Sequence, residues 1–357
     1  MRIALAIGDA GGVGPELAAR LLTHPEMAGR DIIVAGDASV LAMGARHAGV
    51  SLDLPVIGAD QIRAARTTND LPAGHVLLDL ANGAADRVAL GQSDPATGGA
   101  CLQNFACVLQ LAASGIADAA MFTPFNKHSM RLSRPSYVDE IGFINAILNT
   151  DRSGREFNVL DEVWNARVTS HIPLRAVADA LSVERILSSL RLTAEVMAGA
   201  GKPGARIGVA ALNPHAGDGG NFGHEDDEIL APAVAQAVAE GIDAKGPIPS
   251  DTVFVRAIRG EFDAVLTMYH DQGQIAMKLM GFDRGVTLIA GYGFPIVTPA
   301  HGSAFDIAGQ GRADLGATLM AARLGTDLAR LNPARSLRPL PQGWEQRHLE
   351  QAPLVAE

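Results

Sequence analysis

Short apolar runs recur along the chain, and each gives way abruptly to glycine, proline or polar residues. Runs of about four to eight such residues are typical of strands buried within a sheet. Helical stretches lie between them, and this alternation predicts an α/β fold. The expected strands cover 2–7, 31–36, 76–80, 119–123, 166–170, 206–212 and 265–269. The expected helices cover 17–22, 100–114, 142–148, 175–181, 183–199, 225–240 and 312–324, whereas 150–163 and the chain beyond 332 are expected to be irregular.

The composition limits the number of domains and the class of partner. A chain of 357 residues exceeds one ordinary hydrophobic core and predicts two domains. Hydrophobic residues make up 48% and charged residues 19%, which excludes a disordered protein. The net charge of -10 disfavours nucleic acid and anionic membranes, and no apolar stretch approaches the roughly 20 residues of a membrane span. The two cysteines, Cys101 and Cys107, indicate a reducing, cytoplasmic location.

The stretch 265–311 holds two loops of the kind that bind ligands. Its apolar run 265–269 ends in His270-Asp271-Gln272-Gly273, and Lys278 follows on a predicted short helix. Ligands of open α/β sheets bind outside the carboxyl ends of strands, which is where these side chains fall. The second loop, 301–309, is rich in small residues, as expected where the backbone approaches a ligand closely.

Three predicted strands end in histidine in the same manner, at His171, His215 and His270. A single histidine so placed is more often a satisfied polar residue than a ligand. Three at equivalent strand ends can converge, and three imidazoles form a catalytic metal set that leaves one position open. Asp251 and Asp271 are acidic candidates that could orient the imidazoles or transfer protons. The pattern alone leaves a metal site and three unrelated histidines as equal alternatives.

Two further loops carry candidate chemistry. The turn 8–16, GDAGGVGPE, could let a ligand meet a helix N-terminus, or it could be a tight strand–helix connection. Its spacing is not GxGxxG, so an ordinary dinucleotide fingerprint is absent. Lys127 lies just past the strand 119–123, where it could contact an anionic substrate or be a solvated loop lysine.

Several segments in the right order resemble the 4-hydroxythreonine-4-phosphate dehydrogenases of vitamin B6 synthesis. The resemblance runs from residue 8 to about residue 323. It implies the two-domain fold of the isocitrate and isopropylmalate dehydrogenases, with the active site in the interdomain and dimer-interface cleft. It also implies a cofactor-binding domain of residues 1–124 plus 285–357, and a metal-, substrate- and dimer-forming domain of 125–284. Its most specific segments are SHIPLR (170–175), LNPHAGDGG (212–220), PSDT (249–252), MYHDQG (268–273) and HGSAFDIAGQG (301–311).

The resemblance assigns roles to individual residues. It implies that His171, His215 and His270 bind a divalent metal (Zn, Mg, Co or Mn), with ligands drawn from both subunits of a homodimer. The cofactor would be NAD, with NADP as the alternative. It would be bound by His301, Gly302, Ser303, Ala304, Asp306 and Ile307.

The implied reaction is oxidation of a secondary alcohol β to a carboxylate, followed by loss of CO2. Lys278 is the first candidate for substrate contact and proton transfer, supported by Asp271 and Asp251. The substrate-binding candidates are Lys127, Asp139, Glu140, Thr287 and Lys278.

The chain departs from the family where the phosphate is held. The family's Gly-His-Thr-Glu segment corresponds to the region 136–140, which lacks the His-Thr pair, and Asp139 or Glu140 would repel a phosphate dianion. Counted from Lys278, the family's substrate-contacting Asn and Arg fall on Thr287 and Ile296.

These departures favour a small non-phosphorylated carboxylate as the substrate. The alternatives are the parent activity on 4-phosphooxy-L-threonine in pyridoxine biosynthesis, and a terephthalate-type cis-dihydrodiol dehydrogenase. A catalytically inactive metal or nucleotide sensor would require a broken histidine set or cofactor loop, and both are complete.

Overall fold

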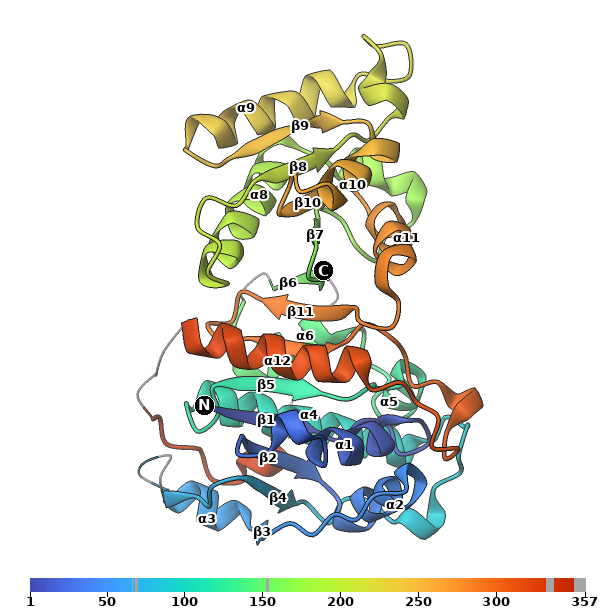
Figure 1. Ribbon diagram of the computed structural model, residues 1–357, viewed down its shortest axis with the longest axis vertical. Helices are drawn as coiled ribbons and strands as arrows, with labels where there is room; N and C mark the ends of the chain where they lie inside the picture. Colours follow the sequence, from blue (N-terminus) through green and yellow to red (C-terminus); the bar gives the residue numbers. More distant parts are fainter. Residues whose placement is uncertain (66, 68–69, 152–153, 332–336, 350–357) are drawn as a thin grey trace. The chain divides into compact units, whose positions relative to one another are not determined.

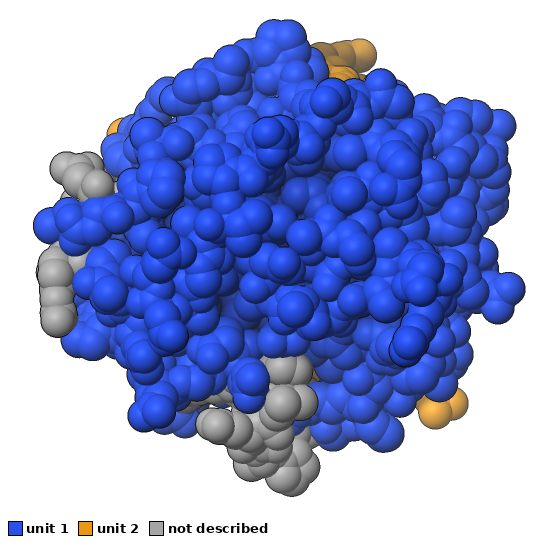
Figure 2. All heavy atoms as spheres, turned by 90° about the horizontal axis from the view of Figure 1, so that it is seen from below, with its two compact units in different colours: residues 1–154, 292–357 blue, residues 155–291 orange. Residues whose placement is uncertain are grey.

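The computed structural model describes residues 1–65, 67, 70–151, 154–331 and 337–349. The chain forms two compact units, which are coloured separately in Figure 2. Unit 1 comprises Met1–Gly154 and Tyr292–Glu357, and unit 2 comprises Arg155–Gly291. Both are α/β structures, and no helix among the described residues is long and apolar enough to span a membrane.

The units divide at other residues than the sequence predicted. Residues 125–154 belong to unit 1, because the helices α5 (Lys127–Ser133) and α6 (Glu140–Leu148) pack on α4 (Pro95–Ala113). Residues 285–291 belong to unit 2, because β11 (Val286–Ala290) pairs antiparallel with β6 (Arg155–Val159). Packing and pairing partners distant in sequence therefore set both boundaries.

The sheet of unit 1 is parallel and is covered by helices (Figure 1). Its strands run in the order β3-β4-β2-β1-β5-β12. Strands covered by helices on both faces must be apolar throughout, which explains the continuous apolar runs. The strands are β1 (Arg2–Ala6), β2 (Asp31–Gly36), β3 (Val56–Ile57), β4 (His75–Asp79), β5 (Ala119–Phe122) and β12 (Ile296–Pro299).

The helices of unit 1 begin at local signals in the sequence. Asp94, for example, caps α4 by accepting hydrogen bonds from the amides of Ala96 and Thr97. Besides α4, α5 and α6, the helices are α1 (Gly14–Leu22), α2 (Ala38–Ala48), α3 (Ala59–Ala64) and α12 (Gly316–Leu331). Short helical turns are η1 (Pro25–Met27), η3 (Ala85–Arg87), η7 (Phe305–Ile307) and η8 (Trp344–Leu349).

An aromatic cluster fixes the segment that follows β5. Phe105 of α4 is fully buried, and its ring centroid lies 4.8 Å from that of Phe122, 5.2 Å from Phe125 and 5.6 Å from Phe143. Such pairs add about 0.5–1.5 kcal/mol each beyond the area they bury. The cluster joins α4, the end of β5 and α6, so it holds the chain on both sides of residues 126–140.

The sheet of unit 2 combines a parallel and an antiparallel part. The order is β11-β6-β7-β10-β8-β9, with antiparallel pairing on both edges of β6 and parallel pairing from β7 to β9. The remaining strands are β7 (Trp164–Arg167), β8 (Ile207–Ala210), β9 (Ala244–Ile248) and β10 (Ala264–Thr267).

Helices α10 and α11 pack on the parallel part of this sheet. Their buried residues Val253, Phe254 and Met277 join a core that includes Val265 of β10. The helical elements of unit 2 are η4 (Leu174–Ala176), α7 (Val177–Ala180), α8 (Val183–Gly199), η5 (Pro214–Gly217), η6 (Asp226–Leu230), α9 (Ala231–Ala239), α10 (Ser250–Ile258) and α11 (His270–Gly281).

Two segments that were expected to be irregular form regular structure. Residues 155–159 form β6, whose Phe157 is buried, although the flanking polar residues concealed the strand. Beyond residue 332, η8 packs on α4, and Trp344 is only 1% exposed. Burial of a large indole outweighs the weak local propensity of this tail. Residues 152–153, 332–336 and 350–357, covered by the same expectations, lie outside the described residues.

Candidate functional site

The three predicted metal ligands follow three adjacent parallel strands of unit 2. β10 lies between β7 and β8, and it pairs parallel with both. His171 lies just beyond β7, His270 opens α11 after β10, and His215 lies in η5 after β8. The ring centroids of His171 and His270 are 5.5 Å apart. Within the described residues of this single chain, no group of three His, Cys, Asp or Glu side chains is placed to hold an ion.

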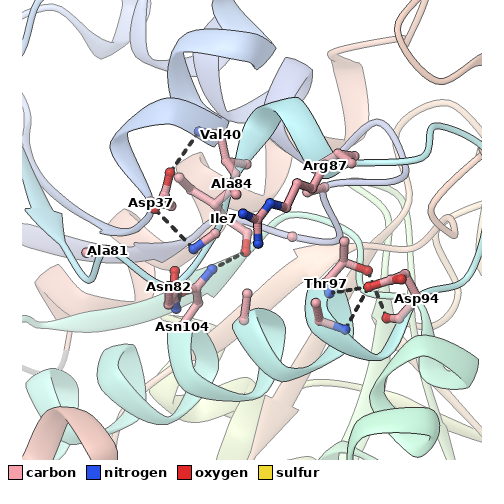
Figure 3. A pocket seen from close by; sticks show the side chains of 16 residues that line it. Ile7, Asp37, Val40, Ala81, Asn82, Ala84, Arg87, Asp94, Thr97 and Asn104 are labelled. Carbon is pink, nitrogen blue, oxygen red and sulfur yellow. Dashed lines mark hydrogen bonds between the residues drawn. The ribbon is translucent and has the colours of Figure 1, made fainter.

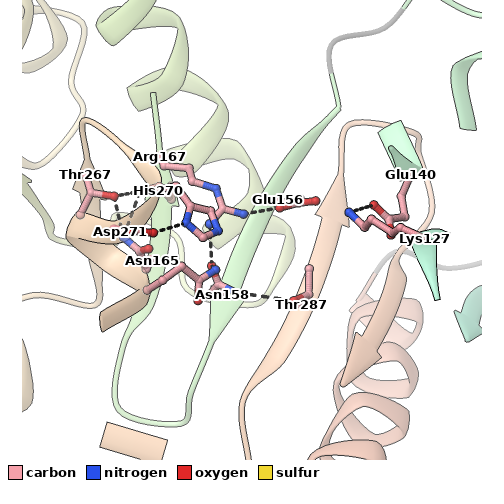
Figure 4. A network of polar contacts seen from close by, with 12 residues as sticks. Lys127, Glu140, Glu156, Asn158, Asn165, Arg167, Thr267, His270, Asp271 and Thr287 are labelled. Atoms are coloured by element: carbon pink, nitrogen blue, oxygen red, sulfur yellow. Dashed lines mark hydrogen bonds and ion pairs between the residues drawn. The ribbon is translucent and has the colours of Figure 1, made fainter. Parts of the chain in front are cut away.

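Asp271 orients His270. The imidazole Nδ1 lies 2.6 Å from a carboxylate oxygen of Asp271 (Figure 4). An Nδ1–H that donates to this carboxylate leaves the Nε2 lone pair free, which is how second-shell carboxylates prepare histidines to bind metals. The Asp271 side chain is 72% exposed, so the contact fixes the ring without contributing much stability.

The loop that carries His215 has a strained backbone. His215, Ala216 and Asp218 have φ angles of 55°, 56° and 46°, in the left-handed region that such residues rarely occupy. Buried Asp226 anchors the loop, because its carboxylate accepts hydrogen bonds from the amides of Leu212 (2.8 Å) and Asn213 (3.0 Å). Strain retained in this way is typical of ligand-binding loops.

The other candidates of unit 2 lie in different settings. Asp251, in the first turn of α10, and Lys278, in the last turn of α11, are both exposed. Thr287 of β11 instead belongs to an internal polar network, since its hydroxyl accepts a hydrogen bond from Asn158 (3.5 Å; Figure 4). Asn158 also binds Arg167 (3.2 Å), a buried arginine paired with Glu156 that the sequence did not single out.

Lys127 of unit 1 forms an ion pair with a buried carboxylate. Its Nζ lies 2.7 Å from Glu140 Oε2, and the two side chains are 40% and 11% exposed (Figure 4). Asp139 is the N-cap of α6 and accepts a hydrogen bond from the Gly142 amide (2.8 Å). Lys127 is therefore neither a free solvated lysine nor an uncompensated positive charge.

The predicted cofactor loop packs on the glycine-rich turn that precedes α1. The Val13 amide donates to the Ser303 carbonyl (3.0 Å), and a Cβ on Gly12 would come within 2.5 Å of the same oxygen. Asn126 Nδ2 donates to Ser303 Oγ (3.3 Å), which places the loop beside the start of α5. A Cβ on Gly8 would lie 2.3 Å from the Pro124 carbonyl. The glycines of this turn thus serve tight chain packing, the simpler of the two alternatives.

The rest of the cofactor loop leaves its backbone accessible. His301 Nδ1 lies 3.0 Å from the Gly302 carbonyl, and a Cβ on Gly302 would meet no protein atom within 4 Å. Ala304 has a φ of 43° and precedes η7, which contains Asp306 and Ile307. An open backbone of this kind can contact a ligand directly.

Unit 1 also contains a cavity that sequence reasoning missed. It has a volume of about 320 Å³ and lies at the carboxyl ends of β1, β2 and β4, between the first turns of α2 and α4 (Figure 3). Its polar lining includes Asp37, Asn82, Arg87 and Asn104, and the candidate turn 8–16 contributes Gly8 and Ala10. The Asn-Gly pair that follows β4 was the available sequence signal. Its size and position suit a small ligand.

Comparison with known proteins shows the family of this chain. The family model for the pyridoxal phosphate biosynthetic protein PdxA matches residues 28–325. The chain belongs to the PdxA family. This assignment makes it an enzyme of the dehydrogenase class of oxidoreductases, as the resemblance implied.

Proteins similar to this chain carry different substrate names. A Rhizobium meliloti protein named "Putative 4-hydroxythreonine-4-phosphate dehydrogenase 2" is 52% identical over 94% of this chain and 95% of its own. A D-threonate 4-phosphate dehydrogenase of Bordetella bronchiseptica is 34% identical over 92% of each chain. A solved terephthalate 1,2-cis-dihydrodiol dehydrogenase of Burkholderia xenovorans LB400 is 28% identical, with a TM-score of 0.62, over 92% of this chain and 98% of its own.

The residue aligned from the sequence with a substrate-contacting arginine of the PdxA family lies inside the sheet. Ile296 is part of β12, which pairs with β5, and it is fully buried. Its apolar side chain offers no hydrogen-bond donor to a phosphate.

Proposed function

We propose that this PdxA-family chain oxidises a secondary alcohol β to a carboxylate, with loss of CO2. It would use NAD, or NADP in its place, together with a divalent metal. The single observation that carries the proposal is the convergence of His171 and His270 at adjacent strand ends, with Asp271 on the second imidazole. We further propose a cytoplasmic homodimer that acts on a small carboxylate.

The metal would be held by His171, His215 and His270. Two imidazoles with centroids 5.5 Å apart, one of them oriented by a carboxylate, form a donor set that suits Zn²⁺, Co²⁺ or Mn²⁺. We propose that a partner subunit completes the set, as the resemblance implies. Such an ion would act as a Lewis acid on the substrate's oxygen atoms.

Side chains of unit 2 would transfer the protons, and backbone groups of unit 1 would bind the cofactor. Lys278 would contact the substrate and return a proton after CO2 is lost, supported by Asp271 and Asp251, and all three are exposed. The exposed backbone at Gly302 would receive the adenosine half of the dinucleotide. Unit 1 would thus be the cofactor-binding unit, and unit 2 would bind the metal and form the dimer.

We propose a non-phosphorylated substrate. A phosphate carries about -1.5 to -2 charges at neutral pH and needs cationic or main-chain donors. Lys127 is already paired with Glu140 at 2.7 Å, and Asp139, next to Glu140 in sequence, is a second acidic residue of this segment. A phosphorylated hydroxy acid is the second candidate, because the R. meliloti and B. bronchiseptica relatives bear names of that kind.

Replacing a proposed metal ligand tests the site directly. His171→Ala and His270→Ala should abolish turnover, while the far-ultraviolet circular dichroism stays unchanged, because both rings lie at the surface of unit 2. His128→Ala is the matched control, since His128 is an exposed histidine of α5 in unit 1. Near-normal activity of either variant in metal-free buffer would remove these histidines from the site.

A further inference from the structure

The side chain of Gln272 connects the ends of two neighbouring strands in unit 2. It lies in the first turn of α11, two residues after His270. Its Oε1 accepts a hydrogen bond from the Met268 amide (2.7 Å), and its Nε2 donates to the Ala211 carbonyl (2.7 Å). The same Nε2 donates to Ser250 Oγ (2.9 Å), which in turn donates to Ala211 (2.6 Å).

Each residue that the Gln272 side chain binds lies close in sequence to a candidate site residue. Ala211 precedes His215 by four positions, and Ser250 is adjacent to Asp251. Met268 precedes His270 by two positions, and its carbonyl accepts hydrogen bonds from the amide (3.1 Å) and hydroxyl (2.7 Å) of Thr169.

Thr169 lies two positions before His171. A continuous set of hydrogen bonds thus connects the Gln272 side chain to the segments that carry the three histidines.

Backbone groups just past a strand end no longer have ladder partners, so another group must bind them. An amide side chain can do this at Met268 and Ala211 together, because it presents an acceptor and a donor side by side. A carboxylate would supply only the acceptor, and an apolar side chain would supply neither.

We propose that Gln272 is a positioning residue for the metal site. It sets the relative placement of the loops that carry His171, His215 and His270, and of Asp251, without contacting metal or substrate itself. This role rests on the proposed metal site, which the test below examines separately.

The test compares Gln272→Met with Gln274→Met in the purified full-length protein. Both glutamines lie in α11 and are half-buried, but Gln274 binds Asn158 Oδ1 (2.8 Å), away from the three loops. Methionine keeps the length of the side chain and removes its hydrogen bonds. Three quantities are measured: Zn²⁺ affinity by calorimetry, the visible spectrum with Co²⁺ bound, and the unfolding midpoint of the metal-free protein.

Gln272→Met should weaken Zn²⁺ binding at least tenfold and alter the cobalt bands, which report ligand geometry. Gln274→Met should leave both at wild-type values. It should also lose less thermal stability than Gln272→Met, because it removes the hydrogen bond to Asn158, whereas Gln272→Met removes those to Met268, Ala211 and Ser250. Equal Zn²⁺ affinity and identical cobalt bands in both variants would overturn the positioning role alone. A wild-type protein that binds neither ion would overturn the metal site itself, and the positioning role with it.

Discussion

The ion pair between Lys127 and Glu140 gives the most specific prediction about substrate choice. Glu140→Gln keeps the shape of the side chain but removes the negative charge 2.7 Å from Lys127 Nζ. Lys127 then loses the anion that competes with an anionic substrate. We expect kcat/KM for 4-phosphooxy-L-threonine to rise, while kcat/KM for the same molecule without its phosphate changes little.

The size of this effect follows from the exposure of the pair. A charge-assisted hydrogen bond contributes about 1.5–3 kcal/mol. Lys127 is 40% exposed, so solvent screening places the gain at the lower end of this range. About 1.4 kcal/mol corresponds to a factor of ten, and we therefore expect a roughly tenfold rise in kcat/KM.

The assay is the initial rate of reduced nicotinamide formation with the phosphorylated and unphosphorylated compounds. Glu162→Gln is the control, because it also removes a carboxylate from an ion pair, that with Arg284 at 2.7 Å in unit 2. It changes the net charge of the chain equally. An unchanged rate on the phosphorylated compound in Glu140→Gln, or an equal rise in Glu162→Gln, would refute this reasoning.

Two further predictions concern unit 1. Gly302→Leu should raise the KM for NAD at least tenfold, because the new side chain blocks the backbone that would contact the cofactor. It should not lower the unfolding midpoint, since a Cβ at this position meets no protein atom within 4 Å. An unchanged KM would exclude this loop from the cofactor site. Burial raises the pKa of Asp9, so its contribution to stability is full below the unfolded pKa near 3.8 and is lost as the pH rises through the higher folded value. The unfolding midpoint of Asp9→Asn should therefore gain on that of the wild type as the pH rises from 3.8 through the raised folded pKa of Asp9, and curves that stay parallel from acid to neutral pH would contradict this.

The sequence predicted those parts of the fold that local pattern determines. The strands β1, β2, β4 and β5 of unit 1 and the strand before His270 are largely apolar runs, as expected for strands that helices cover on both faces. The strand β6 could not be predicted in this way. Its polar residues gain partners only through antiparallel pairing with β11, across more than a hundred positions. The domain boundaries were misplaced for the same reason.

The candidate site could also be predicted only in part from the sequence. Motif order predicted that the histidine segments and the loop at 301–309 form the site, and it also indicated the family that the comparison shows. The burial of Ile296 could not be found by counting residues from Lys278, since spacing along a chain does not reveal which face of a strand is buried. The partner of Lys127 and the cavity near Asn82 depend on contacts between separate elements, which no local pattern encodes.

Steady-state turnover on one matched pair of substrates tests the proposed function most directly. The pair is 4-phosphooxy-L-threonine and its unphosphorylated counterpart, each measured with NAD and NADP, with and without a divalent metal. We predict metal-dependent turnover with the higher kcat/KM on the unphosphorylated compound. A kcat/KM of about 10⁴ M⁻¹s⁻¹ or above on the phosphorylated compound, in the range of efficient enzymes, would contradict the proposed substrate class.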